Sequence, residues 1–189
     1  PHVDKYGASE LEVLLYEMKP AMAAWLAEFA PGLPQRTLAD LVAFNRAHPE
    51  TLAIFGQEWF EQSAAKGPLS SPAYRQALAN GRRYARSQGI DAALRRHQLQ
   101  ALIAPTTGPA GLIDQLYGEN GGPSATSPAA VAGYPHLTVP MGQVRGLPVG
   151  LSFIGTAWTD AELLALGLHY EQATRARQPP RFVTHSAIG

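Results

Sequence analysis

One stretch of this sequence has the composition of a catalytic loop. GENGGPSATSPAAVAGYPHLTVPMG, residues 118–142, is rich in glycine, serine and threonine and leads into an apolar run. Ser124 and Ser127 are its candidate nucleophiles, and each would need a base within hydrogen-bond reach and donors for an oxyanion. The lysines of the chain all precede this stretch: Lys5, Lys19 and Lys66. Because Ser127 stands before Pro128, we expect it to cap a helix, with lining a pocket as the next alternative and nucleophilic attack as the least favoured.

No residue pattern in the sequence indicates a metal or cofactor site. The histidines are scattered, without a spacing such as HExxH: His2, His48, His97, His136, His169 and His185. Neither GxxxxGK[ST] nor GxGxxG follows a predicted strand, so a nucleotide loop is not expected. The chain has no cysteine, which excludes disulfides, zinc–thiolate sites and cysteine catalysis. We expect no metal and no cofactor, and we interpret His136 as an ordinary core-edge histidine in preference to a pocket residue.

Composition and charge restrict the class of protein. The 189 residues are 46% hydrophobic, and the formal net charge is +0 with acidic and basic residues dispersed. This balance argues against a nucleic-acid partner or an anionic membrane surface, since both need a basic patch. No apolar run approaches the roughly 18 residues of a membrane span. The chain begins with Pro1 and not with methionine, so we expect a piece of a longer protein.

The first half, residues 1–98, is predicted to be helical. A capping box at residues 9–12 starts a helix that runs to Phe29 and is kinked by Pro20. The further helices are predicted at residues 37–47, 50–64 and 71–88, and Gly89 interrupts the last of them. Asp91 is expected to cap a short continuation to His97.

The second half, residues 99–189, is predicted to combine strands with short helices. Strands are expected at residues 99–104, 137–141 and 149–154, the last two joined as a hairpin by a turn at residues 142–148. Helices are expected at residues 127–132 and, after a capping box at residues 159–162, to about residue 177. Three strands with this many helices indicate a mixed α/β fold. Because three strands make a poor sheet, the helices should pack on a few strands of a larger mixed sheet.

An ordered set of segments carries a resemblance to a known family. The segments are VAFN (42–45), FGQE (55–58), LIAPTTGPA (102–110), AGYP (132–135), TVPMG (138–142) and LPVGLSFIG (147–155). Together they resemble the C-terminal part of an amidase of the amidase signature family, of the peptide amidase-like type. The resemblance covers residues 9–177 and implies that residues 1–98 and 99–189 together form the C-terminal portion of one larger domain with a twisted mixed sheet.

The resemblance also implies a chemistry. Members of the family hydrolyse carboxylic or peptide amides through an acyl-enzyme, with a serine–serine–lysine triad in and before a glycine- and serine-rich signature. Residues 121–124 only partly match that signature, because Pro123 removes an N–H and the paired serines are missing. We therefore assign no catalytic residue here and expect the triad upstream of Pro1, which would leave this piece inactive alone.

What this chain is expected to supply is the other side of the cleft. By the resemblance, the loop after residue 105 and residues 121–135 face the substrate. The candidate substrate-binding residues are Thr106, Thr107, Ser127 and Tyr134. Gln57 is assigned to packing or hydrogen bonding in preference to substrate contact. The expected partners are a small amide or peptide amide, the missing N-terminal part of the protein, and a second copy of the chain, since an incomplete sheet exposes apolar surface.

Two other functions stay open from the sequence. One is a non-catalytic binding or assembly module that keeps half of this fold. The other is a small independent serine hydrolase built on Ser124 or Ser127, for which no general base is in evidence. A lysine and a GGSSGG-like segment upstream of Pro1 would favour the amidase, and a start codon close to Pro1 would favour the module.

Overall fold

The computed structural model of the chain describes residues 2–111, 116, 118 and 122–180. Its contacts divide the chain into two compact units, residues 4–81 and residues 1–3 with 82–189. Each unit is described by itself. None of the helices in the described ranges combines the length and the hydropathy needed to cross a bilayer.

The unit of residues 4–81 is helical, as the sequence predicts. It contains α1 (Val3–Phe29), α2 (Leu38–Ala47), the 3₁₀ helix η1 (Pro49–Leu52), α3 (Glu58–Ala64) and α4 (Pro72–Arg82). Long-range polar contacts hold α1 to the segments that follow α3. Lys66 pairs with Glu12 at 2.7 Å, and Tyr74 donates its hydroxyl to Glu17 at 2.7 Å.

Local chemistry explains where two of these helices start. Thr37 caps α2, and its side chain and that of Asp40 satisfy each other's backbone N–H groups. α4 begins at Pro72, where the missing N–H leaves no bond unmade. The predicted ends of the first two helices are confirmed, because α1 stops at Phe29 and α2 at Ala47.

Two predictions for this unit are wrong. α1 begins at Val3 and not at Ser9, with Asp4 in the first turn where a negative charge suits the helix dipole. Residues 50–64 do not form one helix, since η1 ends at Leu52 and α3 begins at Glu58. Gln57, the residue before α3, accepts a hydrogen bond from the Asn45 side chain of α2. A side-chain contact is therefore made at the point where the predicted helix is interrupted. The helix α1 continues through Pro20, and the expected kink there stays a prediction.

The second unit opens with an interrupted helix. The π-helical segment η2 (Arg83–Ile90) leads into α5 (Asp91–His97), and Gly89, near the end of η2, has the non-helical angles φ −107° and ψ −106°, which confirms the predicted interruption. A Cβ at Gly89 would collide with the carbonyl oxygen of Tyr84, so this position favours glycine. Asp91 does not cap α5, because that position belongs to Ile90. The contact-defined unit groups residues 82–98 with the strands. That residues 1–98 and 99–189 together form the C-terminal portion of one larger domain stays a prediction.

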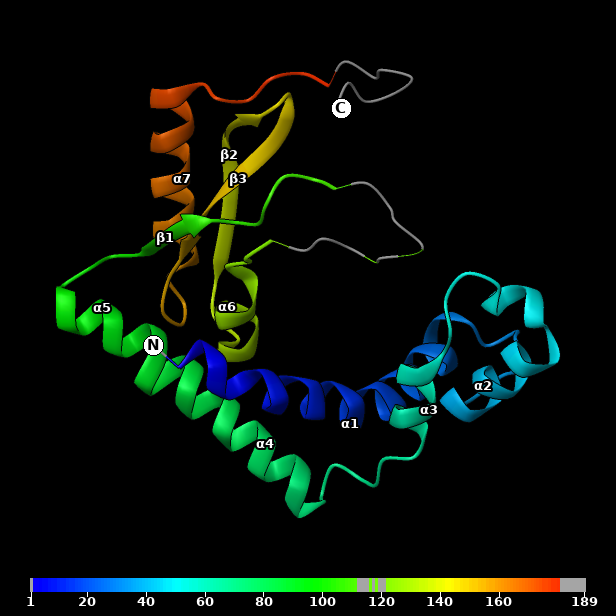
Figure 1. The fold of residues 1–189 in the computed structure, drawn as a ribbon. Coiled ribbons are helices and arrows are strands. Elements are labelled where there is room, and N and C mark those ends of the chain that lie inside the picture. The colour runs from blue at the N-terminus through cyan, green and yellow to red at the C-terminus, as the bar shows by residue number, and fades with distance from the viewer. Residues whose placement is uncertain (1, 112–115, 117, 119–121, 181–189) are drawn as a thin grey trace. The chain divides into compact units, whose positions relative to one another are not determined.

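The three predicted strands form one antiparallel sheet of order β1-β3-β2 (Figure 1). They are β1 (Leu102–Pro105), β2 (His136–Val144) and β3 (Leu147–Ile154). The hairpin is longer than predicted, because β2 continues through a bulge at residues 140–142 and turns at Arg145–Gly146. Both turn residues have positive φ, 51° and 80°, the pattern of a tight two-residue hairpin turn.

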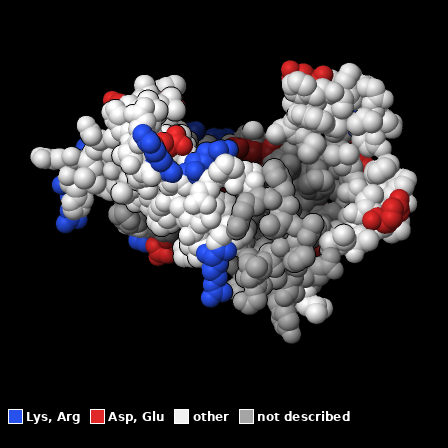
Figure 2. All heavy atoms as spheres, turned by 90° about the horizontal axis from the view of Figure 1, so that it is seen from above, with Lys and Arg blue, Asp and Glu red and all other residues white. Residues whose placement is uncertain are grey.

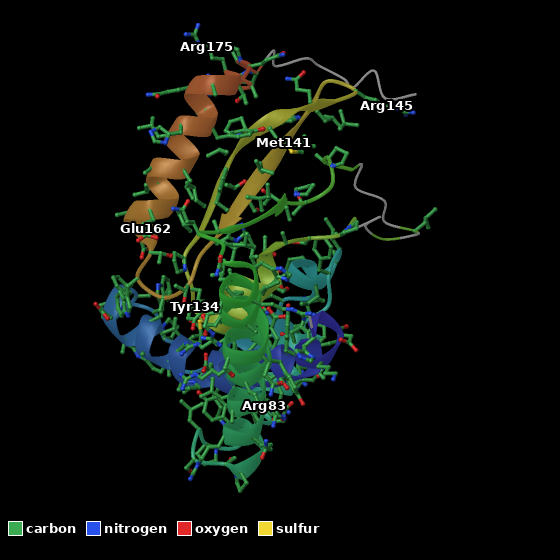
Figure 3. The ribbon with its side chains drawn as sticks, turned by 90° about the vertical axis from the view of Figure 1, so that its left-hand side faces the viewer. Arg83, Tyr134, Met141, Arg145, Glu162 and Arg175 are labelled. Carbon is green, nitrogen blue, oxygen red and sulfur yellow. The ribbon has the colours of Figure 1, made fainter. Side chains whose placement is uncertain are left out.

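One face of this sheet carries the apolar core. α7 (Asp160–Thr174) lies along the hairpin, with Glu162 near the end where Tyr134 lies and Arg175 toward the end where Arg145 lies (Figures 1 and 3). Val139, Phe153 and Leu163 are its buried centre. Because side chains alternate along a strand, the residues between them project from the opposite face.

The boundaries of the helices α6 and α7 differ slightly from the predicted ones. α6 (Thr126–Ala132) begins one residue before the expected position and ends at Gly133, whose φ of 64° suits glycine. α7 ends at Thr174 and not at Arg177. Its predicted capping box is absent, because the Thr159 hydroxyl donates to the Thr156 carbonyl.

Candidate functional site

A connected group of hydroxyls and one imidazole lies on the sheet face opposite α7. Thr106, Thr138, Ser152 and His136 form what we call the hydroxyl network. Ser152 donates to Thr106 Oγ1 at 2.8 Å, the two threonine Oγ1 atoms are 2.6 Å apart, and His136 Nε2 is 2.6 Å from Ser152 Oγ. Ser152 is completely buried, whereas Thr138 is exposed. The network therefore runs from the interior of the sheet to its surface.

Strand register places these side chains together. Thr138 of β2 is paired with Ser152 of β3, and His136 is two residues before Thr138 on the same face. Thr106 follows the last residue of β1 and continues the ladder, because its N–H donates to the Gly150 carbonyl at 2.8 Å. Three strands therefore each contribute to one polar strip.

Gly150 is what allows the two threonines to meet. It lies on β3 between them, and a Cβ there would come within 2.5 Å of Thr138 Oγ1 and 2.8 Å of Thr106 Oγ1. Contacts this short are not tolerated, so any larger residue would separate the hydroxyls. The glycine of the LPVGLSFIG segment thus has a steric reason to be glycine.

Hydrogen-bond directions in the network follow from the donors available. Ser152 has one proton and gives it to Thr106, so His136 must donate from Nε2 to Ser152. The imidazole is therefore the Nε2–H tautomer when neutral. Burial lowers the pKa of His136 below its ordinary value of 6.5, because the imidazolium form loses hydration.

A second polar cluster ties the base of the hairpin to α5. The Asp91 carboxylate accepts the Tyr134 hydroxyl at 2.9 Å and the Thr156 hydroxyl at 2.8 Å, one bond on each oxygen. Tyr134 precedes β2 and Thr156 follows β3. Burial and then the contact with Asp91 raise the pKa of Tyr134 above 10.0.

Arg86 completes this cluster. Its Nε donates to the Ala132 carbonyl at 2.6 Å, at the C-terminal end of α6, and its guanidinium lies 5.4 Å from the centre of the Tyr134 ring. The other end of α6 is held to the hydroxyl network, because the Ala125 N–H donates to the Thr106 carbonyl at 2.9 Å. Residues 125–134 are therefore anchored at both ends.

The structure distributes the four predicted substrate-binding residues over different surroundings. Thr106 belongs to the hydroxyl network and Tyr134 to the Asp91 cluster. Thr107 is exposed and donates to the Gly108 carbonyl. Ser127 lies half-buried in the first turn of α6 and is not its cap, because Thr126 already belongs to the helix. Their contact with substrate stays a prediction, and Gly121, in the predicted substrate-facing segment, lies outside the described residues.

Ser124 also has a structural role. Its hydroxyl oxygen accepts the Thr126 N–H at 3.2 Å and lies 2.8 Å from the Thr126 hydroxyl. These bonds shape the entry to α6 in the way that short serine turns do. Ser124, rather than Ser127, therefore provides the side-chain bond at the start of this helix.

Sequence reasoning missed Ser152, Thr138, Asp91 and Thr156. The sequence did contain one signal. His136 and Thr138 stand at alternate positions of one apolar strand, and Ser152 is a polar residue in the next, so each strand has a polar residue on one face. Asp91 was interpreted locally as a helix cap. Its partners are 43 and 65 residues away in the chain, which no local pattern reveals.

The chemistry that this arrangement can perform is hydrogen bonding. The His136–Ser152 pair has the separation of a base and a nucleophile, but a serine with no exposed surface cannot attack a substrate carbonyl. In the part of the chain that the structure describes, no group of three or more His, Asp and Glu could hold a metal ion. At its exposed end, the Thr138 hydroxyl can donate or accept a hydrogen bond.

Comparisons with known proteins agree on one family. The family model described as Amidase matches residues 43–164. The chain is 30% identical over 173 residues to a probable amidase of Arabidopsis thaliana. This match covers 90% of this chain and 30% of the Arabidopsis protein. It is similar to the native peptide amidase of Stenotrophomonas maltophilia, with a TM-score of 0.88 and 48% identity over 97% of this chain and 37% of that one. A peptide amidase in complex with the competitive inhibitor chymostatin gives a TM-score of 0.91 and 48% identity, over 96% and 37%.

Proposed function

Because this chain belongs to the amidase family, we propose that it forms part of a hydrolase of carboxylic or peptide amides. Its mixed α/β fold is of the amidase signature type, as the sequence predicts. The chain spans 37% of the peptide amidase chain and 30% of the Arabidopsis protein. The activity proposed here is that of the whole protein.

The similarity to peptide amidase carries the choice of substrate. Sequence identity of 48% extends over 97% of this chain, with a TM-score of 0.88. A related peptide amidase binds chymostatin as a competitive inhibitor. We infer that the substrate here is also a peptide whose C-terminal group is an amide, and that its main-chain groups offer carbonyl acceptors and N–H donors to the protein.

The division of labour within the protein is the second part of the proposal. By the family resemblance, the nucleophilic serine, the relay serine and the lysine base lie in a region N-terminal to the part matched here. Lys19 donates to two main-chain carbonyls and Lys66 is paired with Glu12, so neither is set up as a base for a serine. This chain would instead contribute substrate contacts, with Thr106, Thr107, Ser127 and Tyr134 as the proposed residues.

Ammonia release from an N-acylated dipeptide amide tests the proposal. We expect the protein expressed from its complete reading frame to release ammonia, and residues 1–189 alone to release none. No hydrolysis of peptide amides by the complete product would overturn the function. Hydrolysis by residues 1–189 alone would overturn the location of the triad.

A serine-directed fluorophosphonate probe separates the remaining alternatives. We expect it to label the complete product and to leave residues 1–189 unlabelled, with heat-denatured protein as the control for non-specific reaction. Labelling of the short chain at Ser124 or Ser127 would support an independent serine hydrolase. Binding of a peptide amide by the complete product, without labelling or hydrolysis, would support a non-catalytic module.

A further inference from the structure

The hydroxyl network contains more donors than internal bonds. His136 Nε2–H and the hydroxyls of Ser152, Thr106 and Thr138 provide four protons, and the network contains three contacts. One proton is therefore left to point outward. The buried end of the network uses its protons internally, because His136 donates to Ser152 and Ser152 donates to Thr106.

The outward proton belongs at Thr138. Thr106 already accepts from Ser152, and an oxygen that accepts a hydrogen bond becomes a better donor through its own O–H. Donation from Thr106 to Thr138 then continues the chain in one direction. Thr138 is also the exposed member, whereas Thr106 is half-buried. The chain of bonds therefore ends in an O–H donor on the surface of the sheet.

The network carries no ionised acid or base at its outer end. The hydroxyls are neutral, and a carboxylate or phosphate would call for a positively charged partner such as arginine. A neutral carbonyl oxygen needs one well-aimed donor, which is what the network offers. Such oxygens are the main-chain acceptors of a peptide amide.

We propose that the hydroxyl network binds a main-chain carbonyl oxygen of the peptide amide substrate through the Thr138 hydroxyl, with His136 as the residue that fixes the direction of its donors. This inference rests on the proposed function, because it takes the substrate class from it. His136 acts through Ser152 and Thr106 and does not touch the substrate. Gly150 leaves the space in which the two threonine hydroxyls meet.

Kinetics on the protein expressed from its complete reading frame test the donor. Thr138→Val keeps the shape and removes the hydroxyl, so the KM for an N-acylated dipeptide amide should rise about fivefold to tenfold with kcat little changed. Thr138→Ser keeps the hydroxyl and should stay within about twofold of the wild-type KM. If the wild type hydrolyses the amide but Thr138→Val leaves KM unchanged, the inference falls and the proposed function stands.

Histidine variants and spectroscopy test the direction of the chain. His136→Phe should raise KM, whereas His136→Gln, whose amide N–H replaces Nε2–H, should restore most of it. Nitrogen-15 NMR of histidine-labelled protein should show the Nε2–H tautomer at His136. The opposite tautomer would overturn the donor chain whether or not the protein hydrolyses amides. If the wild type hydrolyses no amide, the proposed function fails and this inference fails with it.

Discussion

At the scale of single residues, the position of His136 on the sheet changes the pKa of its imidazole. It is half-buried, and its Nε2 is engaged with a serine that has no exposed surface. Burial disfavours the imidazolium form, so the pKa in the folded protein lies below that in the unfolded chain. The burial of this imidazole therefore makes the fold sensitive to acid.

The sign of this effect gives a prediction. As pH falls through 6.5, the unfolded chain takes up the proton at His136 first, so unfolding becomes easier. Above that pH neither state is protonated, and the contribution is constant. The difference in the free energy of unfolding between the wild type and His136→Gln should therefore move in favour of the variant as pH falls from about 7.5 to about 5. Urea denaturation at a series of pH values measures it, and a difference that is flat with pH would contradict the assignment.

Asp91 is the second residue on which a prediction rests. Asp91→Asn removes the charge that strengthens two hydroxyl donors and leaves one carbonyl acceptor, so the free energy of unfolding should fall by about 2 kcal/mol. The pKa of Tyr134 should also move down toward 10.0, since Asp91 is one cause of its rise after burial. Denaturant melts and ultraviolet titration of tyrosine measure the two effects.

Thr156→Val is the matched control for this change. It removes a single donor and leaves the carboxylate paired with Tyr134, so its effect on stability should be smaller. Equal stability of Asp91→Asn and the wild type would show that the cluster contributes nothing to the fold.

At the scale of secondary-structure elements, Gly150 leaves the space in which side chains from β2 and from the end of β1 meet across β3. The close approach of Thr106 and Thr138 across β3 depends on the missing side chain. Gly150→Ala should destabilise the chain by about 1–3 kcal/mol, because the added methyl group overpacks the site. Gly7→Ala is the control, since a Cβ at Gly7, inside α1, meets nothing within 4 Å and should stabilise by about 0.5–1 kcal/mol. Denaturant midpoints of both variants measure the contrast.

Elements that local chemistry defines were predictable from the sequence. The capping box at Thr37, the proline at the start of α4 and the hairpin between β2 and β3 each have signals within a few residues. The early start of α1 and the passage of β2 through Gly142 were not, because the first lacks a capping box and the second depends on a bulge. In both cases contacts with the rest of the structure determine where the element begins or ends.

The candidate site was predictable only in part, for a related reason. Thr106 and Tyr134 were named through the family resemblance. The pairing of Ser152 with His136 and Thr138 requires the register of the hairpin, and a shift by one residue would turn Ser152 to the apolar face. Register is set by the turn and the bulge together. The strands could therefore be predicted from the sequence, but the side chains that meet across them could not.

At the scale of the whole molecule, several large apolar side chains are exposed. Trp158 is 94% exposed and Phe55 76%, and Ile103 of β1 is 64% exposed. On the face drawn in Figure 2, the described charged side chains stand in small groups among broad uncharged areas. Within the described residues, β1 and β2 each pair on one side only, so the sheet has two open edges. A surface of this kind favours association.

We therefore predict that residues 1–189 alone self-associate. Light scattering should give a mass that rises with protein concentration, while the product of the complete reading frame should be monodisperse. Ile103→Lys, which places a charge on an open edge strand, should lower the association of the short chain. A soluble monomer at every concentration would count against the prediction.

The two bonds to Asp91 have a consequence for motion. They connect α5 to Tyr134, two residues before β2, and to Thr156, two residues after β3, across 43 and 65 positions of the chain. Neither strand of the hairpin can separate from the sheet at that end without breaking a bond to the same carboxylate. In native-state hydrogen exchange, the amides of α5 and of the hairpin base should therefore lose protection together, as one cooperative opening unit.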